Sequence, residues 1–415
     1  MELFEYQKKI VDKAVNYFKN PERHLYENKF NLFLQMGLGK TIIALEIAKR
    51  LQGTTVLVVC PKSLIEMWAY NIGKILKGYS RIDKPEDLWE CTFPSFCVIN
   101  YEYFRTHVDD TVHVDICIFD EVHKLKNIDT KLHKRISAKL YPYQVLCLTG
   151  TPITRDYMDL FGILTCTGSP RVGPYSAAQF RARYIINGGN KRTQELMDYI
   201  EPFSVFGDIN EYVDMPEADD VIIPVHLSLE QLAQLRIIYN SKDNALARIT
   251  RAQTVTSGIE VPKLTPKQIA CIQLIDDMIA DNQKVVLFCK YDKEYDFFMS
   301  HYAGVCVGIN GKTKDRETPV HLFQNDTKFK VFVGNLQTAG TGITLTAASR
   351  CIFYSDTFTW GDAEQSKYRI YRIGQKHNCI YYHLLAIDTI DELIYQSNIN
   401  KTNLIEDFKQ KYGGN

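Results

Sequence analysis

Residues 31–51 read NLFLQMGLGKTIIALEIAKRL, and the interpretation of the chain starts from them. Asn31–Leu34 is a short apolar run of the kind that forms a buried strand, and a glycine loop ending in Lys40-Thr41 follows. Apolar residues from Ile42 to Leu51 then recur at helical spacing. Glycines let backbone N–H groups turn toward a phosphate, and a helix N-terminus adds its positive end. Strand, glycine loop, Lys-Thr and helix in this order are typical of a Walker A loop.

The loop predicts which residues bind ATP. Lys40 is expected to reach the β and γ phosphates, and the Thr41 hydroxyl is expected to ligate Mg²⁺. Leu34 stands where the general pattern has its first glycine. A chance Gly-Lys-Thr in a surface turn is the alternative, which the flanking strand and helix disfavour. The expected phosphate-binding residues are Gly37, Leu38, Gly39, Lys40 and Thr41.

A second apolar strand, Val114–Phe119, ends in the adjacent carboxylates Asp120 and Glu121. Two carboxylates at the C-terminal end of a strand suit a magnesium nucleotide site. Asp120 is expected to hold Mg²⁺, and Glu121 to orient and deprotonate the attacking water. An exposed acidic turn that caps the next helix is the alternative, and the Walker loop upstream disfavours it.

Two weaker signals follow the acidic pair. His123, taken alone, is more often a structural histidine than a catalytic one. Thr149 and Thr151 lie in Leu-Thr-Gly-Thr-Pro, which closes another short strand. Their hydroxyls can hydrogen-bond a phosphate or a neighbouring carboxylate, but a simple Thr-Gly turn explains the same residues.

A similar arrangement recurs near the C-terminus. The glycine-rich loop at 337–345 directly follows a strand-like run at Val331–Val333. Further on, Arg369 and Arg372 are spaced i and i+3, which places both on one face of a predicted helix. Two guanidinium groups there can stabilise charge on a transferring γ-phosphoryl group. A solvated basic helix that binds only phosphate backbone is the alternative.

Short β-branched runs alternate with helical patterns in two sets, about residues 30–165 and 284–395. Continuous apolar strands predict a parallel sheet covered on both faces, hence an α/β fold. We expect a first lobe at 1–210 with an insertion after about 170 and a second lobe at 266–400. An inter-lobe linker and helical protrusion are expected at 211–265, and a tail at 401–415.

Composition excludes several classes of protein. The 415 residues are 45% hydrophobic and 24% charged, which is ordinary for a soluble globular chain and argues against disorder or a coiled coil. Apolar runs are too short for a membrane span, and the polar N-terminus lacks a signal-peptide core, which predicts an intracellular protein. Lys and Arg number 49 and Asp and Glu 49, so attraction for nucleic acid must come from local basic stripes. The eleven cysteines contain no C-x-x-C pair and are expected to be small buried residues.

Together the motifs resemble the Swi/Snf-like branch of superfamily 2 helicases, which are DNA-stimulated ATPases that move along duplex DNA. The match runs in order from near residue 3 to about 396. Its most specific parts are Lys-Leu-Lys-Asn at 124–127 and Arg-Ile-Gly-Gln at 372–375. That family also lacks the first Walker glycine. The resemblance implies two RecA-like parallel-sheet lobes in tandem, with a helical insertion and linker between them.

The resemblance assigns further roles. Gln7 is similar to the family's N-terminal glutamine motif, which reads adenine, and Gly340 and Gly342 are also expected at ATP. The expected coupling residues are His123, Thr149, Thr151 and Gln365. The expected DNA contacts are Lys62, Ser63, Lys124, Lys126, Asn127 and Thr338. Two departures are Phe203–Asp208, where the family often has paired arginines, and Thr344, where Asn is usual.

The resemblance therefore implies an ATP-dependent double-stranded DNA translocase that uses ATP and Mg²⁺ and remodels DNA or protein–DNA complexes. ATP would lie between the lobes, so that hydrolysis requires closure. A strand-separating DNA or RNA helicase and a non-hydrolysing DNA-binding scaffold are the alternatives. Intact Lys40, Glu121 and both arginines argue against the scaffold.

The expected partners are double-stranded or branched DNA and a protein that directs the motor. We expect a monomer without a membrane partner. A motor of this compact type is expected in the cytoplasm of a bacterium or of a phage- or virus-infected cell, or in the nucleus of a eukaryotic host.

Overall fold

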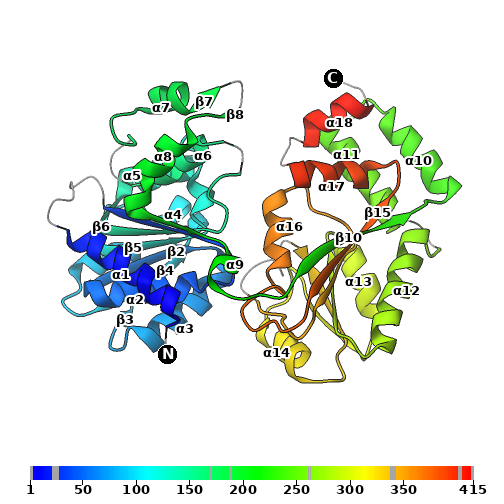
Figure 1. The fold of residues 1–415 in the computed structure, drawn as a ribbon, viewed down its shortest axis with the longest axis horizontal. Helices are drawn as coiled ribbons and strands as arrows, with labels where there is room; N and C mark the ends of the chain where they lie inside the picture. The colour runs from blue at the N-terminus through cyan, green and yellow to red at the C-terminus, as the bar shows by residue number, and fades with distance from the viewer. Residues whose placement is uncertain are drawn as a thin grey trace. The chain divides into compact units, whose positions relative to one another are not determined.

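The computed structural model describes residues 3–20, 28–154, 156–167, 171–186, 189–259, 261, 263–336, 343–400 and 404–412. The chain divides into two compact units, Met1–Asp214 (unit 1) and Met215–Asn415 (unit 2). Figure 1 colours unit 1 from blue to green and unit 2 from green to red. Each unit is built on its own parallel sheet, which confirms the predicted α/β class. The finer boundaries expected at residues 210, 265 and 400 stay predictions.

Unit 1 contains a seven-stranded sheet with the order β3-β4-β2-β5-β6-β1-β9, in which all neighbours are parallel. Every residue of β1 and β2 is buried, because helices cover both faces. The strands are β1 (Lys29–Leu34), β2 (Thr55–Cys60), β3 (Ser80–Arg81), β4 (Ser95–Asn100), β5 (Val112–Asp120), β6 (Leu140–Leu148) and β9 (Ser204–Gly207).

The helices of unit 1 follow from the direction of the chain across its sheet. From β1 through β2 to β4 the chain moves one way, so right-handed crossovers place α2 and α3 on one face, where α1 also packs on α2. The return path through β5 and β6 places α4 and α5 on the other face (Figure 1). These helices are α1 (Glu5–Lys19), α2 (Lys40–Leu51), α3 (Ile65–Ile75), α4 (Tyr101–His107) and α5 (Lys131–Lys139).

Between β6 and the end of unit 1 the chain forms small elements, including a short antiparallel hairpin of β7 and β8. They are α6 (Met158–Leu164), α7 (Ala177–Tyr184), β7 (Ile185–Ile186), β8 (Gly189–Asn190), α8 (Thr193–Ile200) and α9 (Ile209–Tyr212). Among the described residues of unit 1, four 3₁₀ turns connect other elements: η1 (Lys62–Leu64), η2 (Pro85–Glu90), η3 (Val122–Leu125) and η4 (Glu201–Phe203).

Unit 2 contains a six-stranded parallel sheet with the order β10-β15-β14-β11-β13-β12. Its strands are β10 (Ala218–Val225), β11 (Val285–Cys289), β12 (Cys306–Ile309), β13 (Val331–Asn335), β14 (Arg350–Phe353) and β15 (Cys379–Ala386). Its described helices are α10 (Leu229–Tyr239), α11 (Ala245–Ser257), α12 (Pro266–Ala280), α13 (Asp292–His301), α14 (Glu317–Asn325), α16 (Trp360–Lys367), α17 (Ile390–Asn400) and α18 (Leu404–Tyr412).

Strand β10 is the main architectural finding that the sequence did not indicate. It lies within the segment expected as linker and protrusion, yet it pairs along its whole length with β15, from Ala218↔Cys379 to Val225↔Ala386. As the edge strand of the sheet it is mostly exposed and tolerates Pro224. Its acidic start therefore resembles a loop in the sequence.

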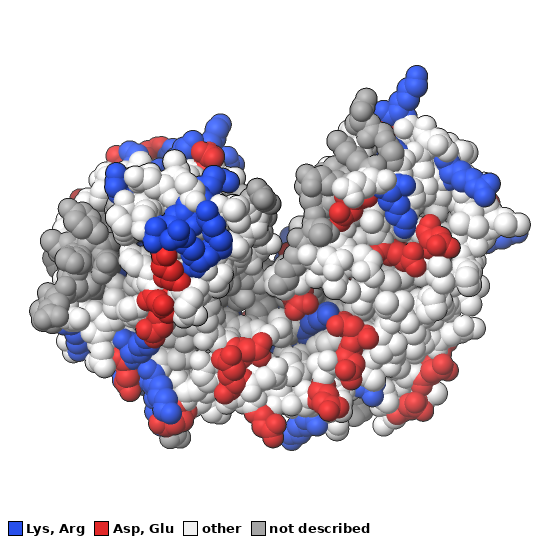
Figure 2. Space-filling model, turned by 45° about the horizontal axis from the view of Figure 1, so that its top comes forward, with Lys and Arg blue, Asp and Glu red and all other residues white. Residues whose placement is uncertain are grey.

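Two properties of the described residues agree with the composition. No described helix is long and apolar enough to cross a membrane. All eleven cysteines are unpaired, and all but Cys91 are buried. Figure 2 shows Lys and Arg interspersed with Asp and Glu over the face in view, in keeping with the balanced net charge.

Candidate nucleotide-binding site

The glycine loop connects the buried strand β1 directly to α2, which begins at Lys40. Gly37 and Gly39 have φ of +91° and +78°, a left-handed conformation that glycine adopts without strain. A Cβ on Gly39 would also lie 2.6 Å from Gln7 Nε2. The turn therefore requires glycine at position 39, and a larger residue there would also displace the end of the Gln7 side chain.

Gln7 lies against this loop. Its Nε2 donates to the Leu38 carbonyl at 3.2 Å, and its Oε1 accepts from the Phe4 backbone N–H at 3.1 Å. The Tyr6 hydroxyl donates to the same Leu38 carbonyl at 3.0 Å. The structure thus joins the predicted adenine-reading residue to the predicted phosphate loop, although residues 7 and 38 are far apart in the sequence.

Lys40 and Thr41 form the first turn of α2 at the carboxyl end of β1. The Lys40 ammonium donates to the carbonyls of Leu34 and Gln35, at 2.8 and 3.3 Å. This places the positive charge at the mouth of the loop. The half-buried Thr41 occupies the adjacent position, as a Walker threonine requires.

Asp120 ends β5 at the same edge of the sheet. β6 places Leu32 and Asp120 in one register, since both lie opposite Leu148. The Trp68 indole N–H donates to the Asp120 carboxylate at 2.8 Å, and the Tyr101 hydroxyl donates to the Asp120 carbonyl at 2.7 Å. These two bonds fix both the side chain and the backbone of Asp120.

Burial raises the pKa of Asp120, and the neighbouring Glu121 raises it further, to about 6. The Trp68 hydrogen bond and the nearby charge of Lys40 oppose this shift. Two buried carboxylates beside a lysine form a donor set that favours a divalent cation, because such a cation would compensate their charge. The residues present therefore fit Mg²⁺, with Asp120 and Thr41 as its predicted ligands.

Glu121 follows in a left-handed conformation, with φ of +55°. A non-glycine residue in this region is uncommon, and such residues are concentrated at functional sites. The turn directs the side chain to His123, whose Nδ1 lies 3.2 Å from Glu121 Oε2.

His123 connects the acidic pair to the end of β6. Its Nδ1 lies 3.0 Å from the Thr149 hydroxyl, and that hydroxyl accepts from the Thr151 backbone N–H at 3.1 Å. Glu121, His123, Thr149 and Thr151 thus form one chain of contacts across two neighbouring strand ends. Of the predicted coupling residues, the three in unit 1 are brought together.

The predicted DNA contacts of unit 1 are less uniform. Lys62, Ser63, Lys124 and Asn127 are exposed. Lys126 differs, because its ammonium donates to the Thr154 hydroxyl and lies 3.9 Å from Asp159. Its amine therefore takes part in an internal network of unit 1.

In unit 2 the predicted helix through both arginines is wrong. Helix α16 carries the half-buried Gln365 and ends at Lys367, so Arg369 and Arg372 lie in the turns that follow. Both guanidinium groups nevertheless converge on the Ile343 carbonyl, at 3.3 and 3.4 Å. Arg372 also donates to the Thr344 hydroxyl at 2.9 Å, and burial lowers its pKa. Thr338, Gly340 and Gly342 lie outside the described residues.

Gln375 ties the end of this turn segment to its surroundings. Its Nε2 donates to the carbonyls of Ala348 and Ile370, at 2.8 and 3.1 Å. Gly374 before it has φ of +103°, a left-handed conformation that glycine adopts without strain. The bond to Ile370 therefore joins Gln375 to the same turns that carry Arg369 and Arg372.

The sequence did not predict the roles of Trp68 and Tyr101 at Asp120. Both are buried aromatic residues with a polar end, which ordinarily finds a hydrogen-bond partner. Tyr101 directly follows β4, whose C-terminus lies at the edge where the site forms. The position of Tyr101 directly after a predicted strand was the feature of the sequence that could have indicated its place at the site.

Fold and site together define a two-unit P-loop protein of the helicase type. Comparison with protein families matches the SNF2-related domain over residues 13–273 and the helicase conserved C-terminal domain over 266–374. The chain therefore belongs to the SNF2-related family, the Swi/Snf-like branch of superfamily 2.

Several relatives are similar over most of this chain. A DNA repair and recombination protein RAD54-like from Drosophila ananassae is 25% identical, over 89% of this chain and 58% of that protein. A chromodomain-helicase-DNA-binding protein 1-like from Mus musculus is 23% identical, over 89% and 46%. An uncharacterized ATP-dependent helicase from Mycoplasma pneumoniae is 24% identical, over 92% and 40%. The chain thus spans about half the length of these relatives.

Among solved structures, the SWI2/SNF2 ATPase core of Sulfolobus solfataricus in complex with double-stranded DNA is similar. It has a TM-score of 0.46 and 23% identity, over 98% of this chain and 92% of that chain.

Proposed function

We propose that the chain is an ATP-dependent double-stranded DNA translocase, a DNA-stimulated ATPase that tracks along duplex DNA and remodels DNA or protein–DNA complexes. One observation carries the ATPase part of this proposal. Lys40 and the buried Asp120–Glu121 pair lie at one edge of the unit 1 sheet, and His123 links that pair to Thr149. Family membership and the printed names of relatives support the choice of DNA.

In this mechanism the loop binds phosphate through its backbone N–H groups and through Lys40, which exchanges carbonyl partners for phosphate oxygens. Asp120 and Thr41 would hold Mg²⁺, which when bound would supply positive charge to the phosphates. Glu121 orients water and accepts its proton. His123 is within reach of both Glu121 and Thr149, so a change at the γ-phosphate reaches the end of β6.

We propose that Arg369 and Arg372 act on the same nucleotide when the two units close on ATP, as the family resemblance implies. Both guanidinium groups, which now donate to the Ile343 carbonyl, would instead stabilise charge on the γ-phosphoryl group. Catalysis would then require residues of both units.

We propose that Lys62, Ser63, Lys124, Asn127 and Thr338 contact the DNA backbone. Phosphate contacts position a protein without reading base sequence, so binding has little sequence preference. Lys126 is a weaker candidate, because its amine already bonds Thr154 and lies close to Asp159.

The test is the steady-state ATPase rate without nucleic acid and with duplex DNA, single-stranded DNA or RNA, with Lys40→Ala as the blank. The proposal expects Lys40-dependent turnover that duplex DNA stimulates most. Stimulation by single strands or RNA alone would instead favour a strand-separating helicase. No Lys40-dependent turnover under any condition would favour a non-hydrolysing scaffold.

A further inference from the structure

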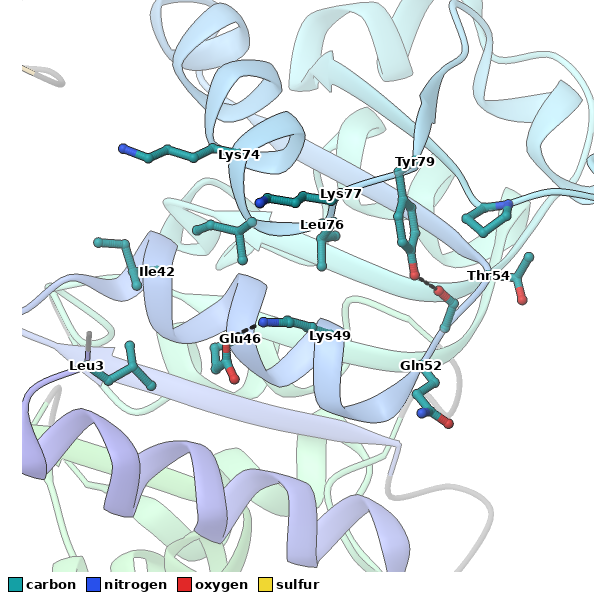
Figure 3. A pocket seen from close by; sticks show the side chains of 13 residues that line it. Leu3, Ile42, Glu46, Lys49, Gln52, Thr54, Lys74, Leu76, Lys77 and Tyr79 are labelled. Carbon is teal, nitrogen blue, oxygen red and sulfur yellow. Dashed lines mark hydrogen bonds and ion pairs between the residues drawn. The ribbon is translucent and has the colours of Figure 1, made fainter. Parts of the chain in front are cut away.

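A cavity of about 780 Å³ lies in unit 1, between the outer side of α2 and the C-terminal end of α3 (Figure 3). It is lined from Ile42 in the first turn of α2 to Gln52 beyond its last. The N-terminal residue Leu3 closes one end. Its size falls within the range of sites that bind ligands, and none of the nucleotide-site roles above uses it.

The lining combines apolar residues with positive charge. Ile42, Ile75 and the buried Leu76 provide apolar surface. Lys49, Lys74 and Lys77 provide three ammonium groups, and Glu46 is the only acidic residue among the described lining residues. Figure 3 shows Glu46 paired with Lys49, at 3.8 Å.

Lys74 and Lys77 are therefore the unmatched charges of this cavity. Both are exposed, and in the described part of the chain neither has a carboxylate partner. An occupant with negative charge at its edge and apolar groups at its centre would complement both features.

We propose that this cavity is a docking site for an acidic amphipathic segment of a protein partner. Apolar side chains of that segment would pack on the half-buried Ile42 and Ile75, and its carboxylates would pair with Lys74 and Lys77. An amphipathic helix presents such anchors at i, i+3 and i+4. Nucleic acid fits less well, because its phosphates would gain no favourable contact with the apolar residues of the cavity.

The position of the cavity gives this docking a consequence. Helix α2 has the Walker residues Lys40 and Thr41 at its start, while Ile42, Glu46 and Lys49 line the cavity. A partner segment in the cavity therefore binds the same helix that holds the nucleotide loop. This site would let a protein partner direct the proposed motor, but its occupancy needs no ATP hydrolysis.

The test is fluorescence anisotropy of a labelled synthetic peptide, with Leu and Glu at helical spacing, titrated with the full chain. We expect saturable binding that Lys74→Glu with Lys77→Glu weakens about tenfold, as two lost charge pairs and two repulsions imply. The matched control is Lys9→Glu with Lys19→Glu on α1, two exposed lysines of the same unit with the same change in net charge. The control should bind like the wild type.

Two further arms separate the alternatives. A peptide with Ser in place of Leu should bind the wild-type chain more weakly, and an Ile75→Ser variant should bind the Leu/Glu peptide more weakly, because the apolar residues of the cavity contribute to binding. Thermal melting of each variant verifies its fold, and the lysine pair stays informative if Ile75→Ser does not fold. Because the readout is binding, a failed ATPase proposal would leave this result interpretable.

The proposal is overturned by any of four outcomes. The Leu/Glu peptide does not bind, or the Lys74 and Lys77 reversal binds it like the control does. The Ser peptide binds as tightly as the Leu peptide, which would indicate a site for simple anions. Labelled duplex DNA loses affinity through the Lys74 and Lys77 reversal but not through the control, which would assign the cavity to nucleic acid.

Discussion

At the scale of single residues, a small number of contacts fixes the positions of Asp120 and Glu121. Trp68 and Tyr101 fix Asp120, and the left-handed backbone of Glu121 directs its carboxylate to His123. The motif order made Lys40, Asp120 and Glu121 predictable, because each directly follows a strand or its loop. Trp68 and Tyr101 were not predicted as partners of Asp120, because their contacts depend on tertiary packing.

Lys40→Ala or Glu121→Gln should abolish ATP turnover while the fold stays intact. Lys40 neutralises charge on the phosphates. The Glu121→Gln substitution replaces the carboxylate with an amide, which cannot accept a proton from water. Steady-state ATPase rates and thermal melting curves of both variants measure the two effects separately. Turnover at the wild-type rate in folded Glu121→Gln would remove that residue from the mechanism.

Arg372→Ala should lower kcat by about 10³-fold, the scale that an arginine finger supplies, with little change in nucleotide affinity. The guanidinium group would act mainly on charge that develops in the transition state. Single-turnover rates and binding of a fluorescent ATP analogue distinguish the two quantities. Lys376→Ala, an exposed neighbour, is the matched control. Equal rates in Arg372→Ala and the control would contradict the role.

At the scale of helices and strands, the parallel strands of both sheets were predictable from their continuous apolar runs. The edge strand β10 was not, because its exposed, acidic start lacks that signal. The helix expected through Arg369 and Arg372 was wrong for a different reason. The i, i+3 spacing of two arginines is compatible with a helix but does not require one, and α16 ends at Lys367, before either arginine.

A buried ion pair should hold α11, α12 and α17 of unit 2 together. Lys267 of α12, fully buried, lies 2.5 Å from Asp391 of α17, which also accepts from Thr256 of α11 at 2.7 Å. Lys267→Met should cost about 3–5 kcal/mol of unfolding free energy, because Asp391 would stay buried without its cation. Lys267→Met with Asp391→Leu should recover much of that loss.

Urea unfolding of the wild type, Lys267→Met, Asp391→Leu and the double variant measures this coupling. If the double variant is as unstable as the sum of the two single variants, the helices do not depend on charge compensation.

His383 should make the stability of unit 2 depend on pH. Burial alone would lower its pKa, but Asp356 and Asp220, at 3.4 and 2.9 Å, outweigh burial and raise the pKa to about 9. Because an unfolded histidine has a pKa of about 6.5, protonated His383 stabilises the fold fully below that pH. That contribution, up to about 3 kcal/mol, should be lost as pH rises from about 6.5 through 9.

Urea midpoints across this pH range measure the effect, with His383→Gln as the comparison. The wild type should lose stability toward pH 9, and the variant should be less stable at neutral pH and vary less. Parallel curves for the two proteins would show that His383 does not carry the dependence.

At the scale of the whole molecule, two units with balanced charge carry complementary halves of a proposed motor. Two α/β lobes could be predicted from the sequence, because short apolar strands alternate with helical patterns in two separate sets. The cavity between α2 and α3 could not, because Leu3, Lys49 and Lys77 lie far apart in the sequence and come together only through packing.

The measurement that tests the central claim most directly is displacement of a third strand from a DNA triplex. A motor that tracks along duplex DNA should release the labelled third strand with ATP, and neither without ATP nor as Glu121→Gln. A forked duplex assayed in parallel should stay paired, since tracking requires no strand separation. An intact triplex in the presence of DNA-stimulated ATP hydrolysis would contradict duplex translocation, and unwinding of the fork would show a strand-separating helicase instead.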